Sequence, residues 1–212
     1  MAIDTWTEIA AARHELADQL ETLDDKAWNT PSLCSGWTVK DVVGHLVMAL
    51  TTPIPKIVAS MVGSGFSFDK ANDKLSRKIA EQKSPAELIA ALRDNADKKI
   101  KPPGMPPSTP LSDITIHTAD IRRPLGLPAQ VPGNRAEAIL DFLAKSKAQG
   151  FVAKGRLAGL RFEASDIDWN SGTEGQLVRG PSEALILALS GRDVALDDLE
   201  GDGVATLRAR SR

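Results

Sequence analysis

One stretch indicates both the fold and the chemistry of this chain: Ser112-Asp-Ile-Thr-Ile-His-Thr-Ala-Asp-Ile-Arg-Arg-Pro-Leu-Gly126. Read as a helix, it places Asp113, His117 and Asp120 on one face at positions i, i+4 and i+7, among isoleucines. We expect this face to be buried. Ionisable groups in an apolar stripe are costly unless they are paired, hydrogen-bonded or bound to a metal. The stretch therefore predicts half of a metal site.

The other half is predicted on an earlier helix, which begins at Trp37-Thr-Val-Lys-Asp-Val-Val-Gly-His-Leu-Val47. Thr38 can cap this helix, and Asp41 three residues later can complete a capping box. His45 then falls at the edge of the apolar face, where an imidazole can look into a cleft between helices. Taken alone, such a histidine is more often a core-boundary residue bonded to a backbone carbonyl.

These residues form a plausible ligand set for a divalent metal. A catalytic zinc site needs three protein ligands and one open position, and His45, Asp113 and His117 supply two imidazoles and a carboxylate. The set suits Zn²⁺ best, but also Fe²⁺, Ni²⁺ or Mn²⁺. Asp-x-x-x-His spacing also occurs in ordinary contacts on helix surfaces. From the residues alone, a buried hydrogen-bonded pair is as good an interpretation as a metal site.

Asp120 and several arginines are candidates for supporting roles. Asp120 lies one turn beyond His117 and can either orient that imidazole or pair with an arginine near the end of the helix. A dicarboxylate or other anionic substrate would favour an arginine in its binding site. Each arginine is equally well interpreted as a solvated surface charge. The candidates are Arg122, Arg123, Arg161 and Arg179.

Composition limits the class of protein. The chain has 212 residues and a net charge of −2, without a strongly basic block, so we expect no nucleic-acid partner. Its single cysteine, Cys34, excludes an internal disulfide, fits a reducing compartment and is interpreted as idle or buried rather than reactive. No signal peptide or membrane span is recognisable. We expect a soluble cytoplasmic protein, a monomer or homodimer, whose partners are small molecules.

Helical periodicity dominates the first two thirds of the chain, and short strands follow. We expect an amphipathic helix over 4–24, a break within 51–68, and a helix opened by the capping box Ser84-Pro-Ala-Glu87 and running to about residue 98. The fold class should therefore be α+β, with a helical domain over 1–150 and a small α+β domain over 151–212. In the second domain we expect strands at 157–164, 167–169, 174–179 and 204–208, with a helix at 184–190.

The motifs around His45 and His117, about seventy residues apart, resemble those of the mycothiol-dependent maleylpyruvate isomerase family, which belongs to the DinB-like group of metal-binding four-helix bundles. Residues 174–192 look like the family's small C-terminal domain, which is similar to sterol-carrier folds. The resemblance implies that His45, Asp113 and His117 are metal ligands. Many relatives carry Glu where this chain has Asp113.

The resemblance also implies an enzyme. In the family, a divalent ion binds mycothiol and lowers the pKa of its thiol. The thiolate adds to the cis double bond of maleylpyruvate, rotation follows, and elimination returns the trans isomer, while other members use the thiol for transfer. Two alternatives remain: a non-catalytic binding protein for an apolar ligand, with a structural His/Asp/His set, and a metal-dependent hydrolase with water in place of the thiol.

Overall fold

The computed structural model describes residues 3–128, 131–145, 148 and 150–210. The chain divides into two compact units, one of which comprises Asp4–Lys101 and His117–Pro128. The other comprises Pro102–Ile116 and the C-terminal part of the chain. A boundary near residue 150 remains a prediction. No helix of the described residues is long and apolar enough to cross a membrane.

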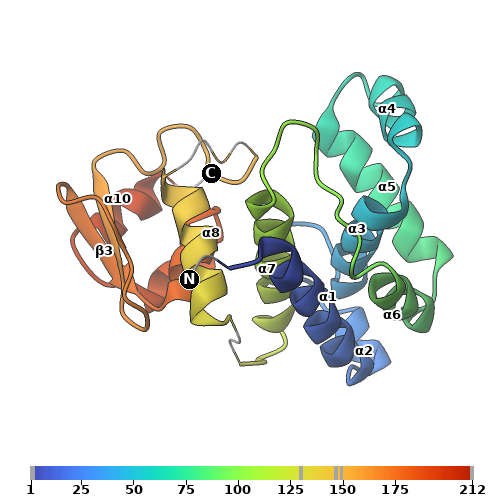
Figure 1. Ribbon diagram of the computed structural model, residues 1–212, viewed down its shortest axis with the longest axis horizontal. Coiled ribbons are helices and arrows are strands. Elements are labelled where there is room, and N and C mark those ends of the chain that lie inside the picture. Colours follow the sequence, from blue (N-terminus) through green and yellow to red (C-terminus); the bar gives the residue numbers. More distant parts are fainter. Residues whose placement is uncertain (1–2, 129–130, 146–147, 149, 211–212) are drawn as a thin grey trace. The chain divides into compact units, whose positions relative to one another are not determined.

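The first unit is built from helices alone (Figure 1). Its core consists of aliphatic side chains, and most of the residues that α3 turns inward are fully buried. Helix α3 packs against both α5 and α6, and α1 packs against α6. The helices are α1 (Thr5–Glu21), α2 (Asp25–Trp28), α3 (Val39–Thr51), α4 (Ile54–Gly63), α5 (Phe68–Gln82), α6 (Pro85–Asp94) and the last part of α7 (Ser108–Arg122).

Two of these helices begin where the sequence predicts, because their capping boxes form. At the start of α3, the Thr38 backbone N–H donates to Asp41 Oδ2 at 2.9 Å, and the Asp41 N–H donates to Thr38 Oγ1 at 3.3 Å. Ser84 and Glu87 make the same reciprocal pair at the start of α6. Each box satisfies N–H groups that the helix itself cannot pair. Helix α6 ends earlier than predicted, at Asp94.

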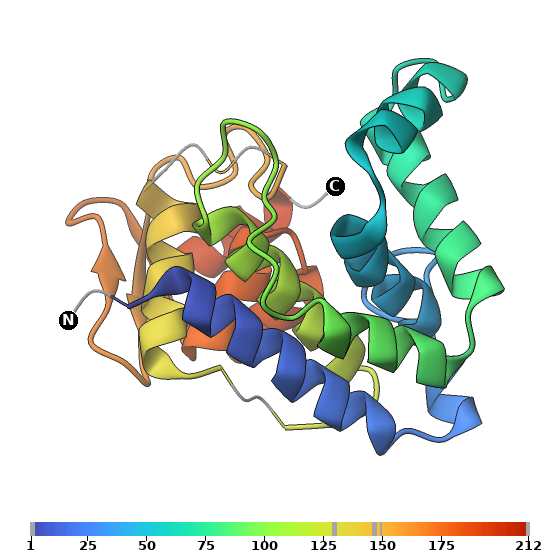
Figure 2. The same ribbon diagram turned by 45° about the vertical axis from the view of Figure 1, so that its right-hand side comes forward.

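The region after α3 breaks as expected and then forms helices that the sequence analysis did not identify. Pro53 occupies the N-cap position of α4 without a capping hydrogen bond, and α5 begins after Ser67, whose side chain accepts a hydrogen bond from the backbone N–H of Lys70. Helix α5 lies alongside α3 (Figure 2). Its fully buried residues are mostly small, including Ala71, Ser76 and Ala80.

Gly44 allows α3 and α5 to approach closely. A Cβ atom at this position would lie 2.7 Å from the backbone oxygen of Ser76 and 2.9 Å from the Cβ atom of Ala80. Neither neighbour is the end of a flexible side chain, so a larger residue would force the two helices apart. The glycine immediately precedes His45, and it therefore determines how near α5 comes to the candidate site.

We expect Gly44→Ala to lower the free energy of unfolding by about 1–3 kcal/mol, the usual cost of overpacking a core. This loss should appear even though alanine has a helix propensity better by about 1 kcal/mol. Gly63→Ala, at the end of α4, is the matched control because nothing lies within 4 Å of its added Cβ. Unfolding in urea measures the free energy of unfolding of both variants. Equal stability of the two variants would show that the α3–α5 contact is not tight.

The second unit contains a three-stranded sheet of order β2-β1-β3, with helices packed against it (Figure 1). The central strand β1 is antiparallel to β2 and parallel to β3, with Phe162 opposite Ser171 and Val178. This arrangement confirms the predicted α+β class. The elements are α8 (Gly133–Lys145), β1 (Leu160–Ala164), β2 (Asn170–Ser171), β3 (Gln176–Gly180), α9 (Ser182–Leu189), η1 (Asp193–Asp198) and α10 (Gly203–Ala209).

Two predicted strands in this unit are wrong. Residues 167–169 are not a strand; instead Trp169 is buried, and its indole N–H donates to Asp141 Oδ1 on α8 at 2.8 Å. Residues 204–208 lie within helix α10, where Leu207 is fully buried. The segment is too short for its period to separate helix from strand.

Candidate metal centre

Helix α7 carries the polar stripe and belongs to both units. Because the helix is continuous, Asp113 lies about one turn before His117, and Asp120 lies about one turn after it. The helix ends at Arg122. Gly126 has φ +67°, and the N–H of Leu127 donates to the Arg122 carbonyl oxygen at 3.1 Å, as in a Schellman motif.

The structure brings together the two histidines that the sequence singled out. His45 on α3 and His117 on α7 have ring centroids 4.8 Å apart, in an edge-to-face arrangement at 72°. Asp113 shares the His117 face of α7 because it lies four residues earlier on the same helix. Whether these three residues bind a metal remains a prediction.

Each histidine has an oxygen atom near its Nδ1 atom. His45 Nδ1 lies 3.0 Å from Asn72 Oδ1 and 3.4 Å from Ser76 Oγ, both on α5. His117 Nδ1 lies 2.9 Å from Asp120 Oδ2. Asp120 is fully buried, so its carboxylate depends on such contacts.

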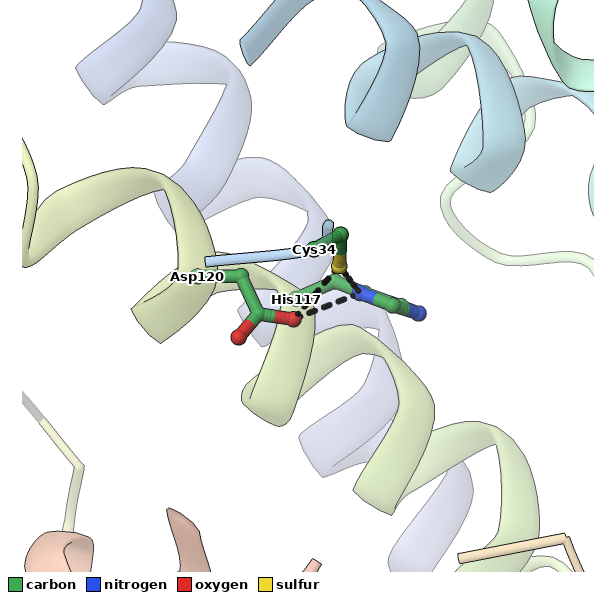
Figure 3. Close-up of side chains that lie close together, drawn as sticks. All are labelled: Cys34, His117 and Asp120. Carbon is green, nitrogen blue, oxygen red and sulfur yellow. Dashed lines mark hydrogen bonds and ion pairs between the residues drawn. The ribbon is translucent and has the colours of Figure 1, made fainter. Parts of the chain in front are cut away.

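Cys34, which the sequence analysis interprets as idle or buried, lies beside His117 and Asp120 of the candidate site (Figure 3). Its Sγ atom donates to Asp120 Oδ2 at 3.1 Å and lies 3.6 Å from His117 Nδ1. The loop that contains Cys34 contacts α7 through its backbone, since the N–H of Leu33 donates to the Asp120 carbonyl oxygen at 3.1 Å. No local pattern links these distant positions, which is why sequence analysis missed the contact. Cys34, His117 and Asp120 also form a second group close enough to hold a metal ion.

Trp37 forms an aromatic neighbour of His45. The two ring centroids are 5.5 Å apart, and the indole N–H donates to Asp73 Oδ1 at 2.7 Å. Arg77 Nε donates to the same oxygen at 2.8 Å. The pKa of Asp73 is lowered, first by the Trp37 hydrogen bond and then by Arg77. Asp73 therefore remains a charged acceptor that holds the indole beside the imidazole.

The candidate arginines fall in different parts of the chain. Arg122 is buried and Arg123 half-buried at the end of α7. Arg161 and Arg179 lie on β1 and β3 of the other unit. Arg179 donates to Glu200 at 2.8 Å and to Glu163 at 3.0 Å, and these bonds raise its pKa. Its ion pairs give Arg179 a structural role, while contact of any arginine with substrate remains a prediction.

The residues present fit a divalent transition metal. Two imidazoles meet edge to face, and an acceptor near each Nδ1 atom favours a proton there and a lone pair on Nε2. A carboxylate one helical turn away completes a nitrogen and oxygen donor set of the kind that zinc and its neighbours accept.

Residues 9–101 match the family model of the mycothiol maleylpyruvate isomerase N-terminal domain. The match includes α3 with His45 and ends before α7. Two proteins that carry the name "Putative metal-dependent hydrolase", from Bacillus cereus (strain G9842) and Bacillus mycoides (strain KBAB4), are each 26% identical over 98 residues. The alignment covers 46% of this chain and 57% of each relative, so the chain spans about half the length of the curated relatives it matches.

Two solved structures have a similar fold. A crystal structure of the mycothiol-dependent maleylpyruvate isomerase has a TM-score of 0.55 and 19% identity, covering 94% of this chain and 92% of that one. A point mutant of that isomerase gives a TM-score of 0.52 with the same identity and coverage. The chain thus has the fold of the mycothiol-dependent maleylpyruvate isomerase, and its residues 9–101 are similar to the N-terminal domain of that family.

Proposed function

We propose that this protein is a metal-dependent enzyme that activates mycothiol for isomerisation or transfer on a small electrophilic substrate, as in maleylpyruvate isomerase. The observation that carries the proposal is the meeting of His45 and His117, with ring centroids 4.8 Å apart. In a chain with this fold and an N-terminal region similar to that family, two imidazoles placed together are suited to bind a metal ion.

The proposed ligands are His45, Asp113 and His117, with zinc as the preferred ion. Each residue offers one ligand atom, and these atoms lie within 4.8 Å of one another. The continuity of α7 supports the inclusion of Asp113, because one helical turn sets its spacing to His117. Aspartate has a shorter arm than the glutamate found in many relatives, yet it supplies the same carboxylate.

A bound divalent ion would supply a thiolate at neutral pH by lowering the pKa of a coordinated thiol. Residues of the chain orient the two histidines that would bind the ion. Asp120 accepts a hydrogen bond from the His117 ring and holds its orientation, and Trp37 covers one side of His45. In an isomerisation, the thiolate would add to the cis double bond of the substrate and leave after rotation, so the thiol is regenerated.

Metal-dependent hydrolysis is the second candidate, because curated relatives that match 98 residues of this chain carry that name. The same three ligands could activate water in place of a thiol. The two candidates differ in one requirement: only the first needs mycothiol.

A turnover assay tests the proposal. Protein loaded with Zn²⁺ should convert maleylpyruvate to its trans isomer when mycothiol is added, and should do nothing without the thiol. His45→Ala, measured alongside, should be inactive under both conditions. Thiol-independent cleavage of ester or amide substrates, without isomerisation, would favour the hydrolase instead.

A further inference from the structure

We propose that Asn72 on α5 is a positioning residue that holds His45 in the tautomer and orientation that present Nε2 to the metal. The proposal deepens the proposed metal centre and rests on it. It concerns a residue on a helix that the sequence analysis did not identify.

The hydrogen-bond chemistry of the pair determines where the proton lies. His45 Nδ1 is 3.0 Å from Asn72 Oδ1, and a carboxamide oxygen can only accept. Nδ1 must therefore donate, and a neutral imidazole has only one N–H. The hydroxyl of Ser76, 3.4 Å away, can also accept. The lone pair consequently lies on Nε2, the atom that would coordinate a cation in the proposed centre.

His117 follows the same rule with a different partner. Its Nδ1 lies 2.9 Å from Asp120 Oδ2, so the lone pair of this ring also lies on Nε2. One histidine is thus paired with a neutral carboxamide and the other with a carboxylate. A carboxylate partner makes a ligating imidazole more basic than a neutral partner does. The chain therefore holds the two imidazoles in the same tautomer but with unequal donor strength.

Helix α5 is placed to hold His45 firmly. The absence of a side chain at Gly44 lets the α5 backbone approach α3 directly beside His45. Adjacent residues of α5 then hold adjacent rings: Asn72 contacts the imidazole, and Asp73 accepts the hydrogen bond of the Trp37 indole. A flip of the imidazole would put a carbon atom opposite the Asn72 oxygen and lose the hydrogen bond.

Two substitutions of Asn72 should affect the Zn²⁺ affinity differently. Asn72→Ala removes the acceptor, and we expect Zn²⁺ affinity to fall by about 10–100-fold, as for other residues that support metal-binding histidines. Asn72→Asp keeps an acceptor and adds charge, so the affinity should equal or exceed that of the wild type. Asn95→Ala is the matched control, because Asn95 only caps α6 through the Ala91 carbonyl oxygen. A purely structural asparagine would not produce this ordering.

Competition with a chelator measures the Zn²⁺ dissociation constants, and circular dichroism shows that each variant is folded. In the metal-free wild type, ¹⁵N NMR should find the His45 proton on Nδ1, and in Asn72→Ala a mixture of tautomers. Equal affinities for wild type and Asn72→Ala would overturn the role of Asn72. If Asn72→Ala does not fold, weaker binding by Asn72→Asp than by the wild type would overturn it as well.

The wild type and His45→Ala distinguish failure of this inference from failure of the metal centre. If wild-type protein binds no Zn²⁺, or His45→Ala binds it equally well, the proposed centre itself is wrong. If binding depends on His45 and is indifferent to Asn72, only the positioning role is wrong.

Discussion

His117→Ala should abolish metal binding, with an affinity at least about a hundredfold below that of the wild type, since even the partners of metal-binding histidines contribute 10–100-fold. His117 belongs to both groups of residues that could hold an ion, the one with His45 and Asp113 and the one with Cys34 and Asp120. Its loss therefore leaves neither group complete. Metal content after dialysis, determined by mass spectrometry, measures the effect.

Two further variants identify the group that binds. Cys34→Ala should keep its metal, because Cys34 contributes a hydrogen bond to Asp120 and no ligand in the proposed centre. His45→Ala should lose it. The reverse pattern, with metal lost from Cys34→Ala and kept by His45→Ala, would move the site to Cys34, His117 and Asp120.

Removal of the metal should weaken mycothiol binding by about a hundredfold or more. An ordinary thiol has a pKa of about 8.5 and is mostly protonated at neutral pH, and stabilising the thiolate by two pKa units is worth about 2.7 kcal/mol. Calorimetric titration of metal-loaded and chelator-treated protein measures the difference. Returning Zn²⁺ to the stripped protein should restore binding.

Mycothiol with its sulfur methylated is the matched ligand control. It keeps the sugar and peptide-like parts but has no thiol to ionise, so its binding should be weak and independent of the metal. Equal affinity of the thiol for loaded and stripped protein would contradict thiol activation and leave water as the nucleophile.

The sequence predicts those features that depend on local spacing. The capping boxes at Thr38 and Ser84 locate two helix starts. The polar stripe of α7 follows from the helical repeat alone. The residue types alone make His45 a candidate partner of His117 but leave a buried hydrogen-bonded pair as an equal interpretation, and the family resemblance favours the metal site.

Other features depend on packing between distant segments. Helix α5 was missed because its buried face is largely made of Ala71, Ser76 and Ala80, which give a weak apolar signal. Its partner surface includes Gly44, a residue whose importance appears only when the two backbones are seen together. The contact of Cys34 with Asp120 joins a loop to a helix 86 positions away, and no periodic pattern in the sequence predicts such a contact.

The position of Cys34 has a practical consequence. Because the chain has no other cysteine, any sulfhydryl-directed dye or spin label attaches at one known position. That position is partly accessible and lies 3.1 Å from Asp120, beside the candidate centre. The protein therefore carries a natural attachment point for a reporter group, through which occupancy of the centre can be followed without engineering a new label site.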